Sequence, residues 1–229
     1  MQFMDEPVKI FSKQNRPTMT QIALENIREA IEKGLLQPGS RIIETQLSKE
    51  LGMSRFPIRE ALCYLEKEGL VQTVPFKGVR VSLITQKDIE DLMNVRCTLE
   101  ELAVRLAIER LDAKKIGVLQ SIMDQMEQAS CENSEEEILN ADLSFHQSIC
   151  EFAENSRLLN AWMPLASQIR VCLKVEYPLF QTAQEFVSTH IPLLEVIVKR
   201  DQQLATQAIR EHICGSQNRI TSASRLNKS

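Results

Sequence analysis

Residues 44–69 read ETQLSKELGMSRFPIREALCYLEKEG, and this stretch decides the fold of the N-terminal part of the chain. The spacing of its leucines predicts a short helix over residues 44–51, and Gly52 suits the left-handed turn that commonly ends a helix. Ser54 is a favourable N-cap for a further helix over residues 55–68. We therefore expect a helix-turn-helix, in which two short helices are joined by a tight turn.

The sequence on either side of this stretch completes a small domain. Apolar residues recur at nearly helical spacing over residues 18–36, and the Pro38-Gly39 pair ends that pattern. After the helix-turn-helix, residues 70–74 and 79–83 alternate apolar and other side chains like the two strands of a hairpin. Three helices followed by a β-hairpin is the order of a winged helix-turn-helix, a fold that binds DNA.

Two arginines of the third predicted helix have the geometry that DNA recognition needs. Arg55 and Arg59 are four residues apart, so they project from one face of the helix. A recognition helix enters the major groove with its N-terminal turn, where arginine can donate hydrogen bonds to base edges or phosphates. Two arginines on a solvated helix face are also commonplace, and the spacing alone leaves that alternative open.

Length and composition set the broad class of the protein. The chain has 229 residues, of which 43% are hydrophobic and 25% are charged, and its formal net charge is -4. The low counts of 7 glycines and 8 prolines argue against a turn-rich all-β fold and favour long helices. Residues 17–83 contain nine basic and eight acidic residues, so the acidic excess belongs to the C-terminal part. The overall acidity therefore does not exclude DNA as a partner.

The sequence lacks the features of membrane and disulfide-rich secreted proteins. No apolar stretch approaches the roughly 18 to 20 residues that cross a bilayer, and residues 1–13 do not resemble a secretory signal. We expect a cytoplasmic protein with no membrane partner. Its six cysteines lie at long spacings without a Cys-x-x-Cys motif, which favours buried, reduced thiols over a disulfide framework or a zinc knuckle.

The remainder of the chain predicts an antiparallel helical bundle, so the expected fold class is mainly α. The expected helices span residues 88–110, 114–130, 135–152, 156–177, 182–200 and 201–220. Pro164 and Pro192 fall inside these patterns, so one or both should mark a kink or an early-turn position. The expected domains are a flexible arm over 1–16, the winged helix-turn-helix over 17–84, the helical domain over 85–220 and a polar tail over 221–229.

The chain contains three histidines, His146, His190 and His212, each on a different predicted helix. Asp142 precedes His146 by four residues, which places a carboxylate and an imidazole one turn apart on one face. The four residues could form a site of three nitrogens and one oxygen for a divalent metal such as Zn, Ni or Mn. A histidine on a helix is more often a packed or surface residue than a ligand, and spacing alone favours that simpler interpretation.

Three runs of residues in the N-terminal part carry a family resemblance. The runs GLLQPG at 34–39, LSKELGMSRFPIREAL at 47–62 and LEKEGLV at 65–71 resemble the DNA-binding domain of GntR-type bacterial transcription regulators. The resemblance covers residues 17–83, and it implies a homodimer that reads a short palindromic operator in double-stranded DNA.

The resemblance also implies which side chains meet DNA. Ser54, Arg55 and Arg59 of the recognition helix would lie at the DNA, and Lys77 and Gly78 would serve the wing. Thr45 falls where some relatives place a DNA-contacting side chain. Phe56 departs from the small polar residue that commonly follows the Ser-Arg pair in such proteins, which leaves the base preference open.

The C-terminal part is similar to the FCD effector domain in the FadR branch of GntR regulators. The motifs are Val95-Arg96-x3-Glu100, Asp142-x3-His146, Thr189-His190-x2-Leu193 and Glu211-His212, within residues 86 to 220. The resemblance implies a metal ion held by Asp142, His146, His190 and His212, with a small organic acid completing its coordination. Arg96 matches the cavity arginine of the family, whose fork of donors suits a carboxylate. A simpler alternative is that Arg96 pairs with Glu100 on a solvated helix face.

The leading hypothesis is a transcription repressor whose operator binding is controlled by a small carboxylate in a metal-containing cavity. An alternative is a direct metal-responsive regulator, in which the ion itself is the signal. A further alternative is a metal-dependent hydrolase, because a site with an open position could activate water. No additional acid or base with a recognisable catalytic spacing supports it, and we expect no enzymatic activity.

Overall fold

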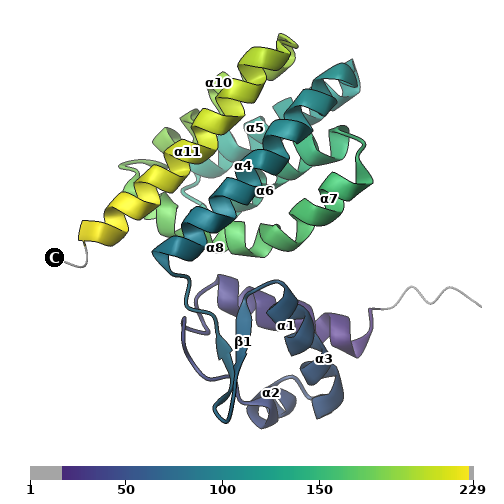
Figure 1. Cartoon of the computed structure of the whole chain (residues 1–229), viewed down its shortest axis with the longest axis vertical. Coiled ribbons are helices and arrows are strands. Elements are labelled where there is room, and N and C mark those ends of the chain that lie inside the picture. The colour runs from purple at the N-terminus through teal and green to yellow at the C-terminus, as the bar shows by residue number, and fades with distance from the viewer. Residues whose placement is uncertain (1–16, 227–229) are drawn as a thin grey trace, which may run out of the picture.

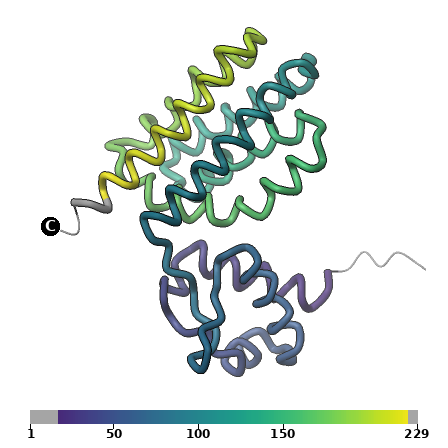
Figure 2. Tube along the Cα trace, in the orientation of Figure 1, coloured from purple at the N-terminus to yellow at the C-terminus, as the bar shows by residue number. Residues whose placement is uncertain are grey.

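The chain folds into two parts that follow one another along the long axis of the molecule (Figure 1). The computed structural model describes residues 17–226, so the arm expected at 1–16 lies outside the described residues. A winged domain forms one part and a helical bundle the other. The trace in Figure 2 shows the chain passing between them immediately before the long helix α4 (Gln86–Glu109).

The N-terminal part is the winged helix-turn-helix that the sequence predicts. Its elements are α1 (Met19–Glu32), α2 (Glu44–Glu50), α3 (Arg55–Lys67), β1 (Val71–Val74) and β2 (Gly78–Val81). The two strands pair antiparallel, with Val71 opposite Val81 and Val74 opposite Gly78. Both strands and two of the helices contribute to a single core, which includes Ala23, Ile27, Ile58, Leu65 and Val81.

Local sequence explains how the helices of this part begin. Thr18 and Gln21 form a capping box, in which the Gln21 N–H donates to Thr18 Oγ1 at 3.1 Å and the Thr18 N–H donates to Gln21 Oε1 at 2.8 Å. Ser54 occupies the N-cap position of α3 as predicted, but its hydroxyl accepts no capping hydrogen bond. Ser54 has the extended backbone that is usual at an N-cap. Its side chain is exposed and takes no part in capping α3.

The C-terminal part is a helical bundle, as the sequence predicts, and four of its helices are long. The elements after α4 are α5 (Ala113–Cys131), α6 (Glu135–Phe152), α7 (Ser156–Trp162), η1 (Met163–Leu165), α8 (Ala166–Glu176), η2 (Tyr177–Leu179), α9 (Ala183–Ser188), α10 (Ile191–Val198) and α11 (Gln202–Leu226). Helices α4 and α11 lie side by side (Figure 1). The core of the bundle includes Met93, Leu119, Phe145, Trp162 and Ile209. No helix within residues 17–226 is both long and apolar enough to cross a membrane.

Two of the predicted long helices are broken in the structure. The pattern over residues 156–177 is interrupted by η1, which contains Pro164. The pattern over 182–200 is interrupted at Thr189 and His190, and Pro192 follows as the second residue of α10. Proline has no N–H to continue the helical ladder, which explains both interruptions. The expectation that one or both prolines mark a kink or an early-turn position is confirmed, since both lie in a first turn, but the continuous helices are wrong.

Two further predictions differ from the structure. Helix α11 continues to Leu226, so the residues expected to begin a polar tail at 221 are helical, because Ile220 and Thr221 are buried against the bundle. The six cysteines are free thiols, but only some are buried as expected. Cys150 and Cys172 are buried and Cys97 is partly buried, whereas Cys63, Cys131 and Cys214 are exposed.

Arg170 of α8 ties the bundle to the winged domain. Its guanidinium lies 3.2 Å from Glu32 Oε2 of α1 and 2.6 Å from Glu136 Oε1 of α6. It also donates to Asn140 Oδ1 of α6 at 2.7 Å. Arg170 is only 4% exposed, so its hydrogen bonds to Asn140 and Glu136 and its ion pair with Glu32 compensate for the loss of water around its charge. The arrangement fixes α8 against both α1 and α6.

Gln168 provides a second tie between the two parts. Its Nε2 donates to the carbonyl oxygen of Glu68, at the end of α3, over 2.6 Å. Gly69 follows in the left-handed region with φ +71°, and a Cβ at that position would lie 2.6 Å from Gln168 Nε2. The end of the helix that bears Arg55 and Arg59 is therefore in direct contact with the bundle.

A pair of glycine substitutions tests this contact. Gly34 has φ +70° and Gly69 has φ +71°, so alanine strains the backbone at both positions by roughly 1–2 kcal/mol. A Cβ at Gly34 meets nothing within 4 Å, whereas Gly69→Ala must displace the Gln168 amide. In urea unfolding we expect Gly69→Ala to lose more stability than Gly34→Ala, by about the 1 kcal/mol of one hydrogen bond. Equal losses would contradict the contact.

Candidate functional site

Helix α6 supplies two polar side chains to the interior of the bundle. Asp142 and His146 lie one turn apart, and both are buried among the apolar residues that fix this face of the helix, including Phe145 and Ile149. Because the apolar stripe of α6 faces the core, residues that share its spacing must also face the core. Of the simpler interpretations, a packed or a surface histidine, the burial of His146 leaves only the packed one.

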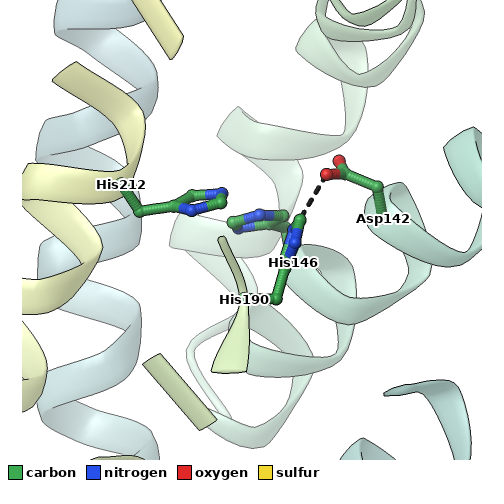
Figure 3. Close-up of side chains that lie close together, drawn as sticks. All are labelled: Asp142, His146, His190 and His212. Atoms are coloured by element: carbon green, nitrogen blue, oxygen red, sulfur yellow. Dashed lines mark ion pairs between the residues drawn. The ribbon is translucent and has the colours of Figure 1, made fainter. Parts of the chain in front are cut away.

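Two histidines from other elements converge on the same place. His190 lies at the break between α9 and α10, and His212 lies on α11. The donor atoms offered by Asp142, His146, His190 and His212 all lie within 4.8 Å of one another. Figure 3 shows the three imidazoles and the carboxylate directed toward a common region. We call these four residues the Asp/His cluster.

The polar atoms of the Asp/His cluster lack protein partners in a way that suits a metal ion. His146 Nε2, His212 Nδ1 and Asp142 Oδ2 are buried and have no hydrogen-bond partner among the described residues. His190 Nε2 lies 2.9 Å from Asp142 Oδ1. Buried polar atoms without partners are costly, and three imidazole nitrogens with one carboxylate oxygen are a donor set for Zn and other divalent ions. The cluster could therefore bind a metal ion.

Glu100 of α4 organises the neighbouring polar groups. Its Oε2 lies 2.6 Å from His146 Nδ1, and its Oε1 accepts hydrogen bonds from Arg96 Nε and Trp162 Nε1, each at 2.8 Å. Glu100 is fully buried. By occupying Nδ1 of His146, the carboxylate leaves Nε2 to face the other members of the cluster, as outer carboxylates do for metal-binding histidines.

The sequence did not assign Glu100 this role. In the sequence, Glu100 ends the Val95-Arg96-x3-Glu100 motif, and its four-residue spacing from Arg96 suggested a pair on a solvated helix face. The Arg96–Glu100 pair is present at 2.8 Å, but both side chains are buried. Trp162, the only tryptophan of the chain, could have indicated the buried acceptor, because a buried indole N–H requires one.

Charge within the site sets the protonation of its carboxylates. Burial alone would raise the pKa of Glu100, but Arg96 and His146 outweigh burial and hold that pKa well below its usual range. Burial would likewise raise the pKa of Asp142, and the hydrogen bond and charge of His190 reverse the shift. Burial and the neighbouring imidazoles of His190 and His146 hold the pKa of His212 well below its usual value. At neutral pH the cluster thus offers an ionised carboxylate and a neutral His212.

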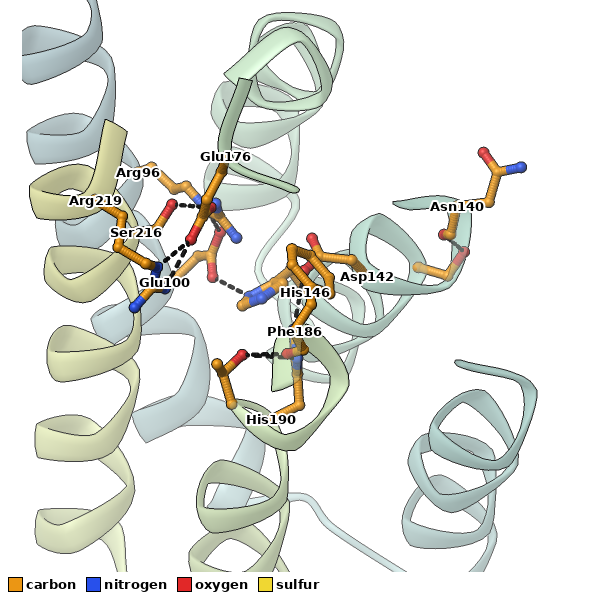
Figure 4. Close-up of polar contacts among 12 residues, drawn as sticks. Arg96, Glu100, Asn140, Asp142, His146, Glu176, Phe186, His190, Ser216 and Arg219 are labelled. Carbon is orange, nitrogen blue, oxygen red and sulfur yellow. Dashed lines mark hydrogen bonds and ion pairs between the residues drawn. The ribbon is translucent and has the colours of Figure 1, made fainter. Parts of the chain in front are cut away.

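Arg96 retains an unused donor beside the Asp/His cluster. Its Nε is bound to Glu100, but its buried Nη2 has no hydrogen-bond partner among the described residues. Figure 4 places it between the cluster and a second polar group, in which Glu176 of α8 accepts hydrogen bonds from Ser216 and Arg219 of α11. A free guanidinium donor next to a candidate metal site can bind an anionic group of a ligand.

The predicted DNA-contacting residues are all exposed on the winged domain. Arg55 and Arg59 are exposed on α3, beside the exposed Ser54. Thr45 is exposed near the start of α2. Lys77 and Gly78 lie at the tip of the hairpin, next to Phe76, whose side chain is fully exposed and whose φ is 61°. All six residues that the sequence predicts to contact DNA are therefore exposed to solvent.

Comparisons with known proteins decide the family. The model of the bacterial regulatory proteins of the gntR family matches residues 20–81, and the FCD domain model matches residues 91–214. The chain belongs to the GntR family. It is a DNA-binding transcription regulator with a C-terminal FCD domain, and proteins of this family are not enzymes. The hydrolase alternative is therefore excluded.

Individual relatives agree with this assignment. The GntR-family chain is 31% identical over 202 residues to the uncharacterized HTH-type transcriptional regulator YdhC of Bacillus subtilis, covering 87% of this chain and 90% of the relative. It is 26% identical to the gluconate operon transcriptional repressor of the same organism, covering 93% and 88%. Its fold is similar to that of McbR/YncC of Escherichia coli, with a TM-score of 0.78 at 22% identity over 91% of this chain and 100% of that one.

Proposed function

We propose that this GntR-family regulator is a repressor whose operator binding is controlled by a small carboxylate bound beside a divalent metal ion in the bundle. The observation that carries the proposal is the convergence of unpartnered buried donors at the Asp/His cluster and at Arg96 Nη2. The gluconate operon repressor among its relatives supports the direction of control.

The chemistry of the two groups favours an organic acid as the ligand. A metal ion held by three imidazoles and one carboxylate can accept further oxygen ligands, and Zn, Ni or Mn each suits this donor set. Arg96 would supply a positive charge and directed N–H donors to the same anion. A carboxylate satisfies both at once, since it carries negative charge and two oxygen acceptors.

The contacts of α6 and α8 indicate how the ligand would influence DNA binding. Helix α6 carries Asp142 as well as Asn140 and Glu136, which hold Arg170. Arg170 in turn lies against Glu32 of α1. A movement of α6 on ligand binding would thus reach the winged domain, together with the connection at residues 82–87. Control requires that the ligand bind more tightly to one arrangement of the two parts than to the other.

The DNA would be contacted by one face of each winged domain in a homodimer. Ser54, Arg55 and Arg59 would enter the major groove with the first turn of α3, and Lys77 and Gly78 would lie against the backbone or minor groove. Thr45 would contact the backbone from α2. Two identical domains related by symmetry would read the two halves of a palindrome.

The direct test is an operator-binding titration of the full-length protein. A duplex that binds the protein is first enriched from a pool of random duplexes. The affinity of zinc-loaded and of chelator-treated protein for this duplex is then measured in the presence of citrate, malate or gluconate. We expect an organic acid to weaken binding of zinc-loaded wild type, and Arg96→Ala to respond less. If zinc alone changes the affinity for the duplex and no acid has an effect, the result would favour the alternative that the protein responds directly to the metal ion.

Phe56 offers a separate test of the proposed DNA face. It lies in the first turn of α3 between Arg55 and Pro57, and its side chain is 69% exposed. An exposed phenyl ring at this place can contact the C5-methyl group of thymine. Replacing single thymines of the enriched duplex by uracil removes that methyl group. At one position we expect wild type to lose about fourfold in affinity and Phe56→Ala to lose nothing; equal responses at every position would contradict the contact.

A further inference from the structure

The two exposed arginines of the recognition helix are bound to one carboxylate. Glu44 Oε2 accepts a hydrogen bond from Arg55 Nη2 at 3.1 Å and from Arg59 Nε at 2.7 Å. The side chains of Arg55 and Arg59 are 52% and 60% exposed, whereas that of Glu44 is 24% exposed. Glu44 is the first residue of α2, so its position is set by a different element from the one that carries the arginines.

The double ion pair is not needed to hold α2 against α3. Exposed ion pairs add little to stability, and Leu47 of α2 and Leu51 directly after it already pack against the core of the winged domain. Glu44 also places a negative charge beside the surface that must approach a polyanion, which by itself disfavours DNA binding. A role in stability alone therefore does not account for a carboxylate in this place.

The geometry of the pair instead determines which arginine donors remain free. Arg59 uses Nε to bind Glu44, so both of its terminal nitrogens can donate together to O6 and N7 of a guanine. Arg55 uses one terminal nitrogen and keeps the other and Nε. An unheld arginine can rotate toward any phosphate within reach, and phosphate contacts carry no sequence information.

We propose that Glu44 is a positioning residue that directs Arg55 and Arg59 toward base edges and away from phosphates, and thereby sets operator selectivity. This inference rests on the proposed contact of Arg55 and Arg59 with DNA. It goes beyond that contact by assigning the selectivity to a residue that need not touch a base itself. It is independent of the metal and of the ligand.

The test compares Glu44→Gln with Glu50→Gln, which removes the same charge from the same helix. Glu50 is exposed at the end of α2 and accepts a hydrogen bond from Gln46 at 2.8 Å. Full-length variants are titrated with the duplex enriched by wild type and with a shuffled duplex of the same composition. Since both variants lose one negative charge, each should bind the shuffled duplex somewhat more tightly.

The ratio of the two affinities distinguishes the variants. We expect Glu44→Gln to lose about tenfold in selectivity for the enriched duplex, and Glu50→Gln to keep the selectivity of wild type. When duplexes are enriched again from the random pool with Glu44→Gln and with Arg59→Ala, we expect both variants to lose base preference at the same positions of the operator. A thermal unfolding curve confirms that each variant is folded.

Other outcomes would overturn the inference in different ways. If Arg59→Ala loses operator binding while Glu44→Gln and Glu44→Ala, the second of which also removes the acceptor oxygen, both keep the selectivity of Glu50→Gln, Glu44 has no positioning role and the DNA contact stands. If Arg59→Ala binds the enriched duplex as wild type does, both the contact and the inference are wrong.

Discussion

Replacing His190 with alanine is expected to reduce the metal content of the purified protein from near one ion per chain to almost none. His190 is fully buried, and its Nε2 lies 2.9 Å from Asp142 Oδ1, so it is one of four donors that a bound ion would share. The loss of one donor removes a bond and opens the site to water. Elemental analysis of protein made without a histidine tag measures the result directly.

A thermal-shift measurement extends this prediction to stability. An ion that binds only the folded protein stabilises it by about 2.7 kcal/mol at a hundred times its dissociation constant. Zinc should therefore raise the Tm of wild type but not that of His190→Ala. Glu195→Ala, on the exposed face of α10, is the control and should respond like wild type. Metal retained by His190→Ala, or absent from wild type, would contradict the proposed site and leave Arg96 to bind the ligand.

Replacing Glu100 with glutamine is expected to destabilise the bundle strongly. Glu100 and Arg96 are both buried, and removing one partner of a buried ion pair typically costs about 3–5 kcal/mol. The same change alters the hydrogen bond that orients His146, which should weaken metal binding by about 10- to 100-fold. Urea unfolding and zinc titration measure the two effects separately.

The neighbouring residue supplies a matched control for this change. Glu101 pairs with Arg210, whose side chain is largely exposed, so Glu101→Gln should cost no more than about 1 kcal/mol. The double variant Arg96→Met with Glu100→Gln removes both charges and should recover part of the stability without restoring metal affinity. If Glu100→Gln behaves like Glu101→Gln in both measurements, the buried network does not hold the site together.

The winged domain could be predicted from the sequence because its signals are local. Gly52 and Gly69 end helices, and Pro38 and Gly39 separate α1 from α2. The alternation of apolar and other side chains over the two strands predicts the hairpin. The Asp/His cluster could also be predicted from the sequence, since Asp142 and His146 share a helix face and the chain has only two other histidines. The structure brings all four together, and their binding of metal remains a prediction.

The remaining features depend on contacts between distant residues. His190 lies at a helix break that the pattern over 182–200 did not reveal, because Pro192 is compatible with both a first turn and a kink. Glu100 and Trp162 are 62 residues apart, and no local spacing links them. Arg170 and Glu32 likewise meet only when the bundle and the winged domain are in place.

The separate cores of the two parts have an evolutionary consequence. Each part has its own apolar core, and α8 ties them together through polar contacts of Arg170 and Gln168 and through Val171, which packs against the core of the winged domain. Few positions would need to change in concert for one half to be exchanged by recombination. A lineage could in this way acquire a new effector while keeping its operator, or keep its effector and move to new genes.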